Sequence, residues 1–167
     1  DQGVNFFDTA DMYNAGESEV VVGKAIADRR EQVVLATKGR NRMGEGPNAL
    51  GGSRLHLTRA IDESLRRLNT DRIELYYLHA PDPAVPVSES AAALKQLMEA
   101  GKILSVGVSN FNVQQLEEFA AVCPIAAYQP HYNMLQREVE QSQLPWCIEH
   151  NVSVMVYWPL MKGLLAG

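Results

Sequence analysis

The sequence has no long apolar run and no cluster of basic residues. Within its 167 residues, no apolar stretch approaches the roughly 20 residues that a membrane helix requires. The first residues, DQGVNFFD, lack the basic region and apolar run of a signal peptide. The net charge of -5 is spread along the chain, without a lysine or arginine run that would follow a phosphate backbone. We therefore expect a soluble, cytoplasmic protein that binds neither membranes nor nucleic acid.

Cysteine is scarce, and no spacing typical of a metal site occurs. Cys123 and Cys147 are the only two cysteines, and they lie far apart and outside any CxxC. Two such cysteines do not form a disulfide framework, and neither is flanked by groups that would stabilise a thiolate. We expect packing thiols in a reducing compartment. HExxH and CxxC are both missing, so we predict no metal site.

The sequence instead alternates regularly between short apolar runs and amphipathic segments. The runs predicted as strands are residues 3–7, 33–37, 73–78, 103–108, 125–129 and 152–157. Helical apolar spacing occurs between them, including at residues 18–28, 57–68, 88–100 and 113–122. The runs are continuous and rich in β-branched residues, as parallel strands covered by helices tend to be. We therefore predict a single α/β domain over residues 1–167.

Two architectures accommodate six parallel strands: an open doubly wound sheet and most of a (β/α)8 TIM barrel. The periodicity does not separate them. An open dinucleotide-binding sheet should carry GxGxxG after its first strand, and none occurs here. The glycine-rich residues 44–52 lack the GK[ST] ending of a P-loop, so we interpret them as a flexible loop near a site entrance. We favour an incomplete barrel, whose strands all end on one face.

Ionisable side chains stand at the carboxyl ends of the first three predicted strands. Asp8 follows the first, Lys38 the second and His79 the third, while Tyr13 lies in the loop after the first. Neighbouring barrel strands are about 4.8 Å apart, so these side chains can meet. An isolated phenol has a pKa near 10, and a nearby ammonium favours its ionised form. The set suits acid catalysis at a carbonyl, with Tyr13 as the acid, Asp8 anchoring Lys38, and His79 donating to a substrate oxygen.

Each of these four residues also has a structural interpretation. Asp8 suits a turn or a helix cap, and Lys38 suits a solvated strand end. His79 suits a satisfied structural histidine, and Tyr13 suits a loop plug. Four separate coincidences at one barrel mouth are less expected than a single site.

Six segments distributed over almost the whole chain carry a family resemblance: GVNFFDTADMY, GESEVVVGKAI, VVLATK, LRRLNTDRIELYYLH, GKILSVGVSNF and YQPHYNMLQRE. They resemble the successive signature segments of the aldo-keto reductase superfamily. By this resemblance Asp8, Tyr13, Lys38 and His79 are its catalytic tetrad, with Tyr13 as proton donor. The tetrad contains no reductant, so a cofactor must supply the electrons. The resemblance implies NADP(H), with NAD(H) as the alternative, and a small carbonyl compound as substrate.

The resemblance also implies a set of cofactor contacts near the later strand ends. They are Ser109, Asn110, Gln129, Tyr157, Trp158, Pro159 and Leu160. The first three would hydrogen-bond the nicotinamide carboxamide, and Tyr157 would stack on the nicotinamide ring. Trp158 stands where a serine is usual in the family, so a side-chain hydrogen bond to the pyrophosphate is in doubt. The backbone amides of residues 158–160 would remain for that contact.

By the same resemblance the chain covers the second to the seventh strand of the barrel, so the first and eighth strands are not part of it. An unclosed parallel barrel exposes unpaired backbone at two edges. We therefore expect residues 1–167 alone to bind cofactor weakly and to be inactive. The oligomeric state is not indicated by the sequence.

Three functions are compatible with the sequence. The first is an NADPH-dependent oxidoreductase that reduces aldehydes or ketones to alcohols. The second is a cofactor-binding regulatory subunit with little turnover, as in the potassium-channel-associated branch of the superfamily; His79 disfavours it, because those relatives tend to lose this histidine. The third is a barrel hydrolase or lyase using Asp8 with Asp11 or His79, in which Lys38 beside a phenol has little use.

Overall fold

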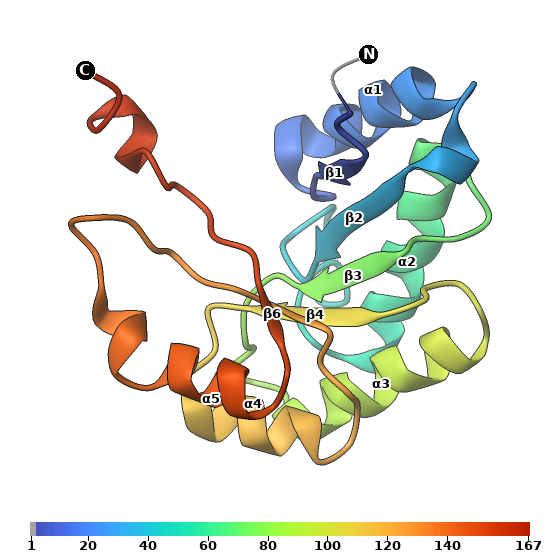
Figure 1. Ribbon diagram of the computed structural model, residues 1–167. Helices are drawn as coiled ribbons and strands as arrows, with labels where there is room; N and C mark the ends of the chain where they lie inside the picture. The colour runs from blue at the N-terminus through green and yellow to red at the C-terminus, as the bar shows by residue number, and fades with distance from the viewer. Residues whose placement is uncertain (1–2) are drawn as a thin grey trace.

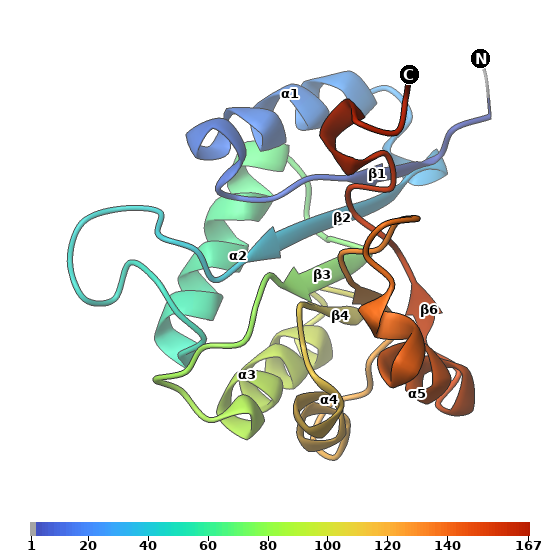
Figure 2. The same cartoon turned by 90° about the vertical axis from the view of Figure 1, so that its left-hand side faces the viewer.

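Six parallel strands form one curled sheet, with the helices on its outer side (Figure 1, Figure 2). The computed structural model describes residues 3–167. The strands are β1 (Phe6–Asp8), β2 (Val34–Gly39), β3 (Leu75–Leu78), β4 (Val106–Ser109), β5 (Ala127–Gln129) and β6 (Ser153–Val154). They pair in chain order, and every pair is parallel. The predicted incomplete (β/α)8 barrel is confirmed.

The helices follow the strands as right-handed crossovers require. They are α1 (Glu17–Ile26), α2 (Arg54–Leu68), α3 (Val87–Glu99), α4 (Val113–Ala120) and α5 (Gln143–Glu149). Ser53 caps α2 by accepting a hydrogen bond from the backbone N–H of His56. Helix α5 was not among the predicted helices, because it is short and contains Pro145. Proline is tolerated there because the first turn has no backbone partner for its missing N–H.

The strands are shorter than their apolar runs. The run 152–157 forms a ladder only over Ser153–Val154, and Tyr157 adds an isolated parallel bridge to His131. The run 103–108 likewise begins its ladder at Val106, after an isolated bridge between Ile103 and Ile73. The apolar runs therefore mark the buried segments of the chain. The hydrogen-bonded strand occupies only part of each run.

Two apolar clusters lie on opposite faces of the sheet. The larger fills the layer between the sheet and the helices and includes both cysteines, which are unpaired and whose pKa burial raises to about 11. The smaller lies inside the curl and includes Tyr77. Gly107 makes room for it, since a Cβ there would lie 2.5 Å from the Tyr77 ring. The Tyr77 ring thus packs closely against β4 on the concave side of the sheet.

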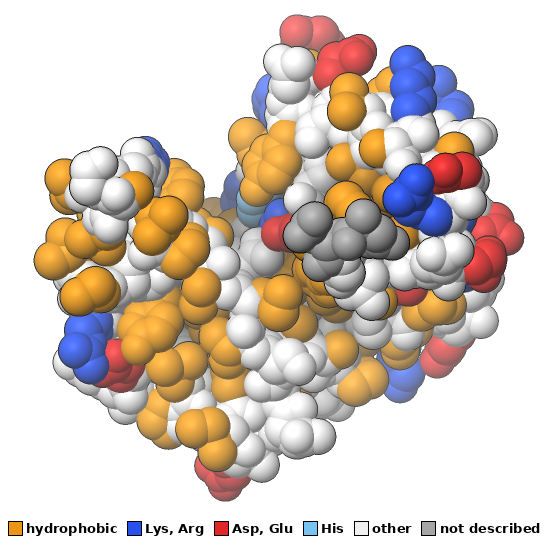
Figure 3. All heavy atoms as spheres, turned by 45° about the horizontal axis from the view of Figure 1, so that its top comes forward, with side chains coloured by type: hydrophobic (Ala, Val, Ile, Leu, Met, Phe, Trp, Pro, Cys, Tyr) orange, Lys and Arg blue, Asp and Glu red, His pale blue; other side chains and the backbone are white. Residues whose placement is uncertain are grey.

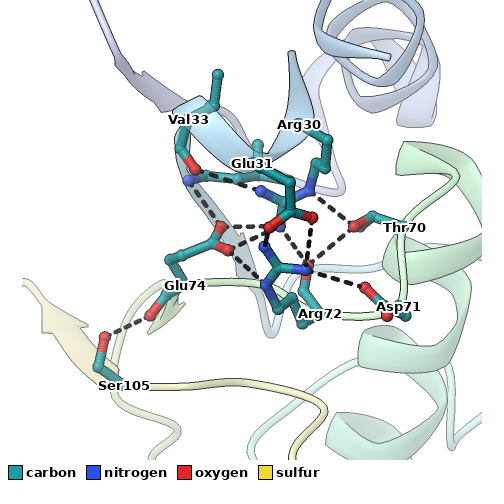
Figure 4. A network of polar contacts seen from close by, with 9 residues as sticks. Arg30, Glu31, Val33, Thr70, Asp71, Arg72, Glu74 and Ser105 are labelled. Atoms are coloured by element: carbon teal, nitrogen blue, oxygen red, sulfur yellow. Dashed lines mark hydrogen bonds and ion pairs between the residues drawn. The ribbon is translucent and has the colours of Figure 1, made fainter. Parts of the chain in front are cut away.

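An ion-pair network joins β2 and β3 at their amino ends (Figure 4). Arg30 donates to both carboxylate oxygens of Glu74, at 3.0 and 2.8 Å. Arg72 donates to Glu74 at 3.1 Å and to Glu31 at 2.8 Å. The Glu74 carboxylate also accepts the backbone N–H of Leu35 at 3.0 Å. Because it ties a side chain from before β3 to the backbone of β2, the network fixes the register of the two strands.

Across residues 3–167, no helix combines the length and the apolar character needed to cross a bilayer. The same residues contain no group of three or more histidine, cysteine, aspartate or glutamate side chains arranged to hold a metal ion.

Candidate active site

Asp8, Lys38 and His79 meet at the carboxyl ends of β1, β2 and β3. Asp8 is the last residue of β1, Lys38 the penultimate residue of β2, and His79 directly follows β3. The Lys38 ammonium donates to Asp8 Oδ1 at 2.8 Å and to the carbonyl of Thr9 at 2.7 Å. Only 1% of the Lys38 side chain is exposed, against 32% for Asp8. The ammonium is therefore fixed in place, and solvent reaches the site from the side of Asp8.

Tyr13 is held over the same end of the sheet by the loop after β1. Backbone N–H groups of Thr9 and Asp11 donate to carbonyls of β2, so the loop continues alongside that strand. Tyr13 Oη lies 3.5 Å from Lys38 Nζ, and the Tyr13 ring contacts the His79 ring edge to face at 6.1 Å. The tyrosine is 41% exposed. Its hydroxyl can therefore face both the ammonium and a molecule entering from solvent.

The environment of His79 keeps its imidazole neutral. Burial lowers the pKa of His79 to about 4, assisted by the positive charges of Lys38 and Arg40 and opposed by Asp8. The amide nitrogen of Asn41 lies 3.0 Å from Nδ1 of the ring. When Asn41 donates to Nδ1, the ring proton stays on Nε2, where it is free to donate to a substrate.

We expect His79 to titrate far below the usual range. NMR of imidazole carbons in the folded protein should give a midpoint near 4 for this residue, against about 6.5 in the unfolded chain. Because the folded state binds this proton less tightly, the contribution to stability is complete above pH 6.5 and is lost as the pH falls toward 4. A midpoint near 6.5 in the folded protein would show that the ring is solvated.

The polar residues at the ends of β4 and β5 form a chain of hydrogen bonds that reaches the tetrad. Ser109 Oγ donates to the carbonyl of Gln129 at 2.7 Å. The Asn110 amide donates to Ser109 Oγ at 2.9 Å and to the carbonyl of His79 at 3.2 Å. The Gln129 amide donates to Asp8 Oδ2 at 3.0 Å. Asp8 is thus held from both sides, by Lys38 on one oxygen and by Gln129 on the other.

The segment after β6 closes one side of this mouth. Tyr157 Oη donates to Asn110 Oδ1 at 2.8 Å, and its ring stacks on His131 with centroids 5.1 Å apart. A cavity of about 430 Å³ lies between these elements, lined by Tyr13, His79, Ser109, Asn110, Gln129, Tyr157 and Trp158. Figure 3 shows a hollow in the surface beside the C-terminal segment. Hydrophobic side chains gather on the segment itself.

Two of the cofactor residues implied by the resemblance do not line this cavity. Pro159 faces a different surface depression, beside Asn133 and Val156, and Leu160 is 54% exposed. Trp158 lines the cavity with its ring packed edge to face against His131, and Lys162 Nζ lies 3.9 Å from the centre of that ring. The structure therefore brings together the tetrad and five of the seven implied cofactor residues.

Two contacts of the site were not predicted from the sequence. Asn41 lies beside His79, and Gln129 binds Asp8 although the resemblance gave it only a cofactor role. Asn41 could have been considered from the sequence, because it is a polar residue only three positions after Lys38. The contact of Gln129 with Asp8 spans 121 positions, so no local pattern could have shown it.

The structure is a parallel half-barrel with lysine, aspartate, tyrosine and histidine side chains together at one rim. The chain belongs to the aldo/keto reductase family, whose model matches residues 1–167. It is 43% identical to the aldo-keto reductase YhdN of Bacillus subtilis over 169 residues, which cover 100% of this chain and 51% of that protein. The chain thus spans about half the length of the curated relatives it matches.

Solved structures share the fold. The glycerol dehydrogenase AKR11B4 of Gluconobacter oxydans superimposes with a TM-score of 0.90 at 38% identity, over 98% of this chain and 51% of that one. An aldo-keto reductase of Klebsiella pneumoniae in complex with NADPH gives a TM-score of 0.84 at 34% identity, over 96% of this chain and 54% of that one.

Proposed function

We propose that the protein is an oxidoreductase that uses NADP(H), with NAD(H) as the alternative, to reduce small aldehyde or ketone carbonyls to alcohols. The observation that carries this proposal is the buried Lys38 ammonium, which contacts Asp8 at 2.8 Å and lies 3.5 Å from the Tyr13 hydroxyl. A hydroxyl beside a fixed positive charge loses its proton more readily, because the charge stabilises the oxygen that remains.

In this proposal, Tyr13 gives its proton to the carbonyl oxygen of the substrate. Lys38 stabilises the tyrosine oxygen, and Asp8 holds the ammonium in position. His79, neutral and protonated at Nε2, donates a hydrogen bond to the same substrate oxygen and thereby orients the carbonyl. None of these side chains is a reductant, so the nicotinamide cofactor supplies the hydride when it is bound.

The cavity beside Tyr13 fits a flat heterocycle that carries a carboxamide. One wall presents the polar side chains of Ser109, Asn110 and Gln129, and another presents the aromatic ring of Tyr157. Polar groups can pair with the carboxamide while an aromatic face covers the ring. The structural neighbour from Klebsiella pneumoniae that was solved with NADPH supports this assignment.

A hydride-transfer experiment on the full-length protein tests the function. On rapid mixing of the NADPH-loaded protein with a panel of small aldehydes and ketones, the nicotinamide absorbance should fall in step with alcohol formation. Residues 1–167 alone should bind NADPH weakly and show no turnover, because both edges of the curled sheet are open.

Tight NADPH binding with no hydride transfer to any carbonyl would reject the enzymatic proposal and favour the regulatory alternative. The intact contact set around Tyr13 supports turnover, since a subunit that only binds cofactor has no need of a positioned acid. Hydrolysis by Asp8 is disfavoured because both carboxylate oxygens are engaged, one by Lys38 and one by Gln129.

A further inference from the structure

The His79 ring is held at one nitrogen and open at the other. Its backbone is fixed, because the N–H donates to the carbonyl of Gly39 at 3.1 Å and the carbonyl accepts from the Asn110 amide at 3.2 Å. Nδ1 of the ring lies 3.0 Å from the amide nitrogen of Asn41. Nε2 makes no hydrogen bond among residues 3–167, and His79 lines the cavity beside Tyr13. Nε2 is therefore the ring nitrogen left for a molecule in that cavity.

The position of the ring proton depends on the amide of Asn41. Burial lowers the pKa of His79 to about 4, so the ring is neutral near pH 7 and carries one proton, on Nδ1 or on Nε2. If the amide presents its nitrogen, Nδ1 accepts and the proton lies on Nε2. If the amide presents its oxygen, Nδ1 keeps the proton and Nε2 becomes an acceptor. The orientation of one amide thus decides whether His79 can donate to a substrate.

The sulfur of Met12 distinguishes the two orientations of this amide. The Asn41 nitrogen that faces His79 also donates to Met12 Sδ, at 2.8 Å. A thioether sulfur can accept weakly and cannot donate, so it pairs with the amide N–H and not with the amide oxygen. The NH2 group has two hydrogens, one for each partner. The Asn41 oxygen makes no hydrogen bond among residues 3–167, so no contact of its own favours the reverse orientation.

The base of the 40–52 loop holds Asn41 in this place. The loop stands out beside α2, with Asn41 as its second residue (Figure 2). Arg40 has a φ of 135°, which is uncommon for a residue with a Cβ. Its carbonyl accepts the backbone N–H of Gly51 at 2.7 Å, and its guanidinium donates to the carbonyl of Pro81 at 3.2 Å. Such a backbone conformation persists where surrounding contacts fix it, and it is found most often at functional sites.

We propose that Asn41 is a positioning residue that sets the tautomer of His79, and that the Met12 sulfur selects the orientation of the Asn41 amide. Asn41 does not line the cavity of Tyr13, so it acts through the imidazole. With the proton on Nε2, the ring donates to the carbonyl oxygen, on which negative charge grows as the hydride arrives. The role in turnover rests on the proposed carbonyl reduction, whereas the tautomer is a property of the protein without substrate.

Imidazole ¹⁵N NMR of the full-length protein at pH 8 reports the tautomer directly. In the unaltered protein, His79 should show a protonated Nε2 and an unprotonated Nδ1. Asn41→Asp places a carboxylate, which can only accept, opposite Nδ1, so this pattern should reverse. Met12→Leu conserves volume and removes the acceptor, so the reversed form should become detectable beside the original one.

Asn41→Asp should lower kcat for carbonyl reduction on the order of tenfold at pH 8, because one hydrogen bond to the substrate oxygen is lost. KM should change less, since that bond strengthens as charge develops on the oxygen. Acid should restore turnover, because a second proton on the His79 ring occupies Nε2. The introduced carboxylate and Asp8 favour this proton, while Lys38 and Arg40 oppose it. A merely structural defect would not recover with falling pH.

Asn48→Asp is the matched control, because it makes the same change in the same loop, at an exposed residue that does not line the Tyr13 cavity. It should alter neither the tautomer of His79 nor kcat. A protonated Nδ1 in the unaltered protein would overturn the proposal whether or not any variant folds. An unchanged tautomer in Asn41→Asp or Met12→Leu would do the same, as would a reversed tautomer with unchanged turnover. The NMR spectra need no turnover, so they are distinguishable from failure of the proposed function.

Discussion

Tyr13→Phe should lower the kcat of carbonyl reduction in the full-length protein by about 10²- to 10⁴-fold, the range that a positioned general acid contributes. The substitution removes only the hydroxyl oxygen, which lies 3.5 Å from Lys38 Nζ. The aromatic ring remains, and with it the edge contact to His79. We therefore expect NADPH affinity, measured by fluorescence titration, to stay nearly unchanged while turnover falls.

Tyr132→Phe serves as the control for this change. The Tyr132 hydroxyl binds Glu140 and lies outside the cavity of Tyr13, so its loss should leave kcat unaltered. Turnover by Tyr13→Phe at the rate of the unaltered protein would reject Tyr13 as the acid. A parallel loss in both variants would indicate that tyrosine hydroxyls matter for folding and not for the chemistry.

Glu19→Gln should lower the free energy of unfolding by about 3 kcal/mol, measured by urea denaturation of the full-length protein. Glu19 is fully buried and binds Arg67, whose side chain is 16% exposed. The variant leaves the guanidinium without its close partner, because the remaining acid, Glu63, is 3.9 Å away. Removal of one member of a buried pair costs more than the pair contributes, since the other charge stays desolvated.

Glu31→Gln makes the same chemical change on the surface and is the matched control. Glu31 also binds an arginine, Arg72, but its side chain is 79% exposed. Solvent screens such a pair, so the effect on unfolding should be much smaller. Equal effects in the two variants would show that burial of Glu19 does not determine its contribution.

The sequence was sufficient for the fold class because the strands and helices alternate with distinct apolar patterns. It was less informative about the extent of each element. Helix α5 was missed because a seven-residue segment containing Pro145 shows little helical periodicity. The apolar run 152–157 overestimated the length of β6, since apolar residues continue past the two residues of its ladder.

The candidate site was predictable where an ionisable residue stands at the carboxyl end of a predicted strand. Asp8, Lys38 and His79 could be placed on one rim because parallel strands share a direction. Their partners could not: the bond from Gln129 to Asp8 depends on the curl of the whole sheet, and the contact of Asn41 with His79 depends on the path of the loop after β2. Such contacts arise from tertiary packing and leave no periodic trace.

The arginine and glutamate network of Figure 4 lies at the amino ends of β2 and β3, whereas Asp8, Lys38 and His79 occupy the opposite rim. The ion pairs that join β2 to β3 thus lie at one end of the strands, and the candidate active site lies at the other end. Residues 40–52 contribute nothing to that network, so the loop can diverge in length and side chains without releasing the strands beneath it. The contacts that hold β2 to β3 at their amino ends would therefore persist through such changes.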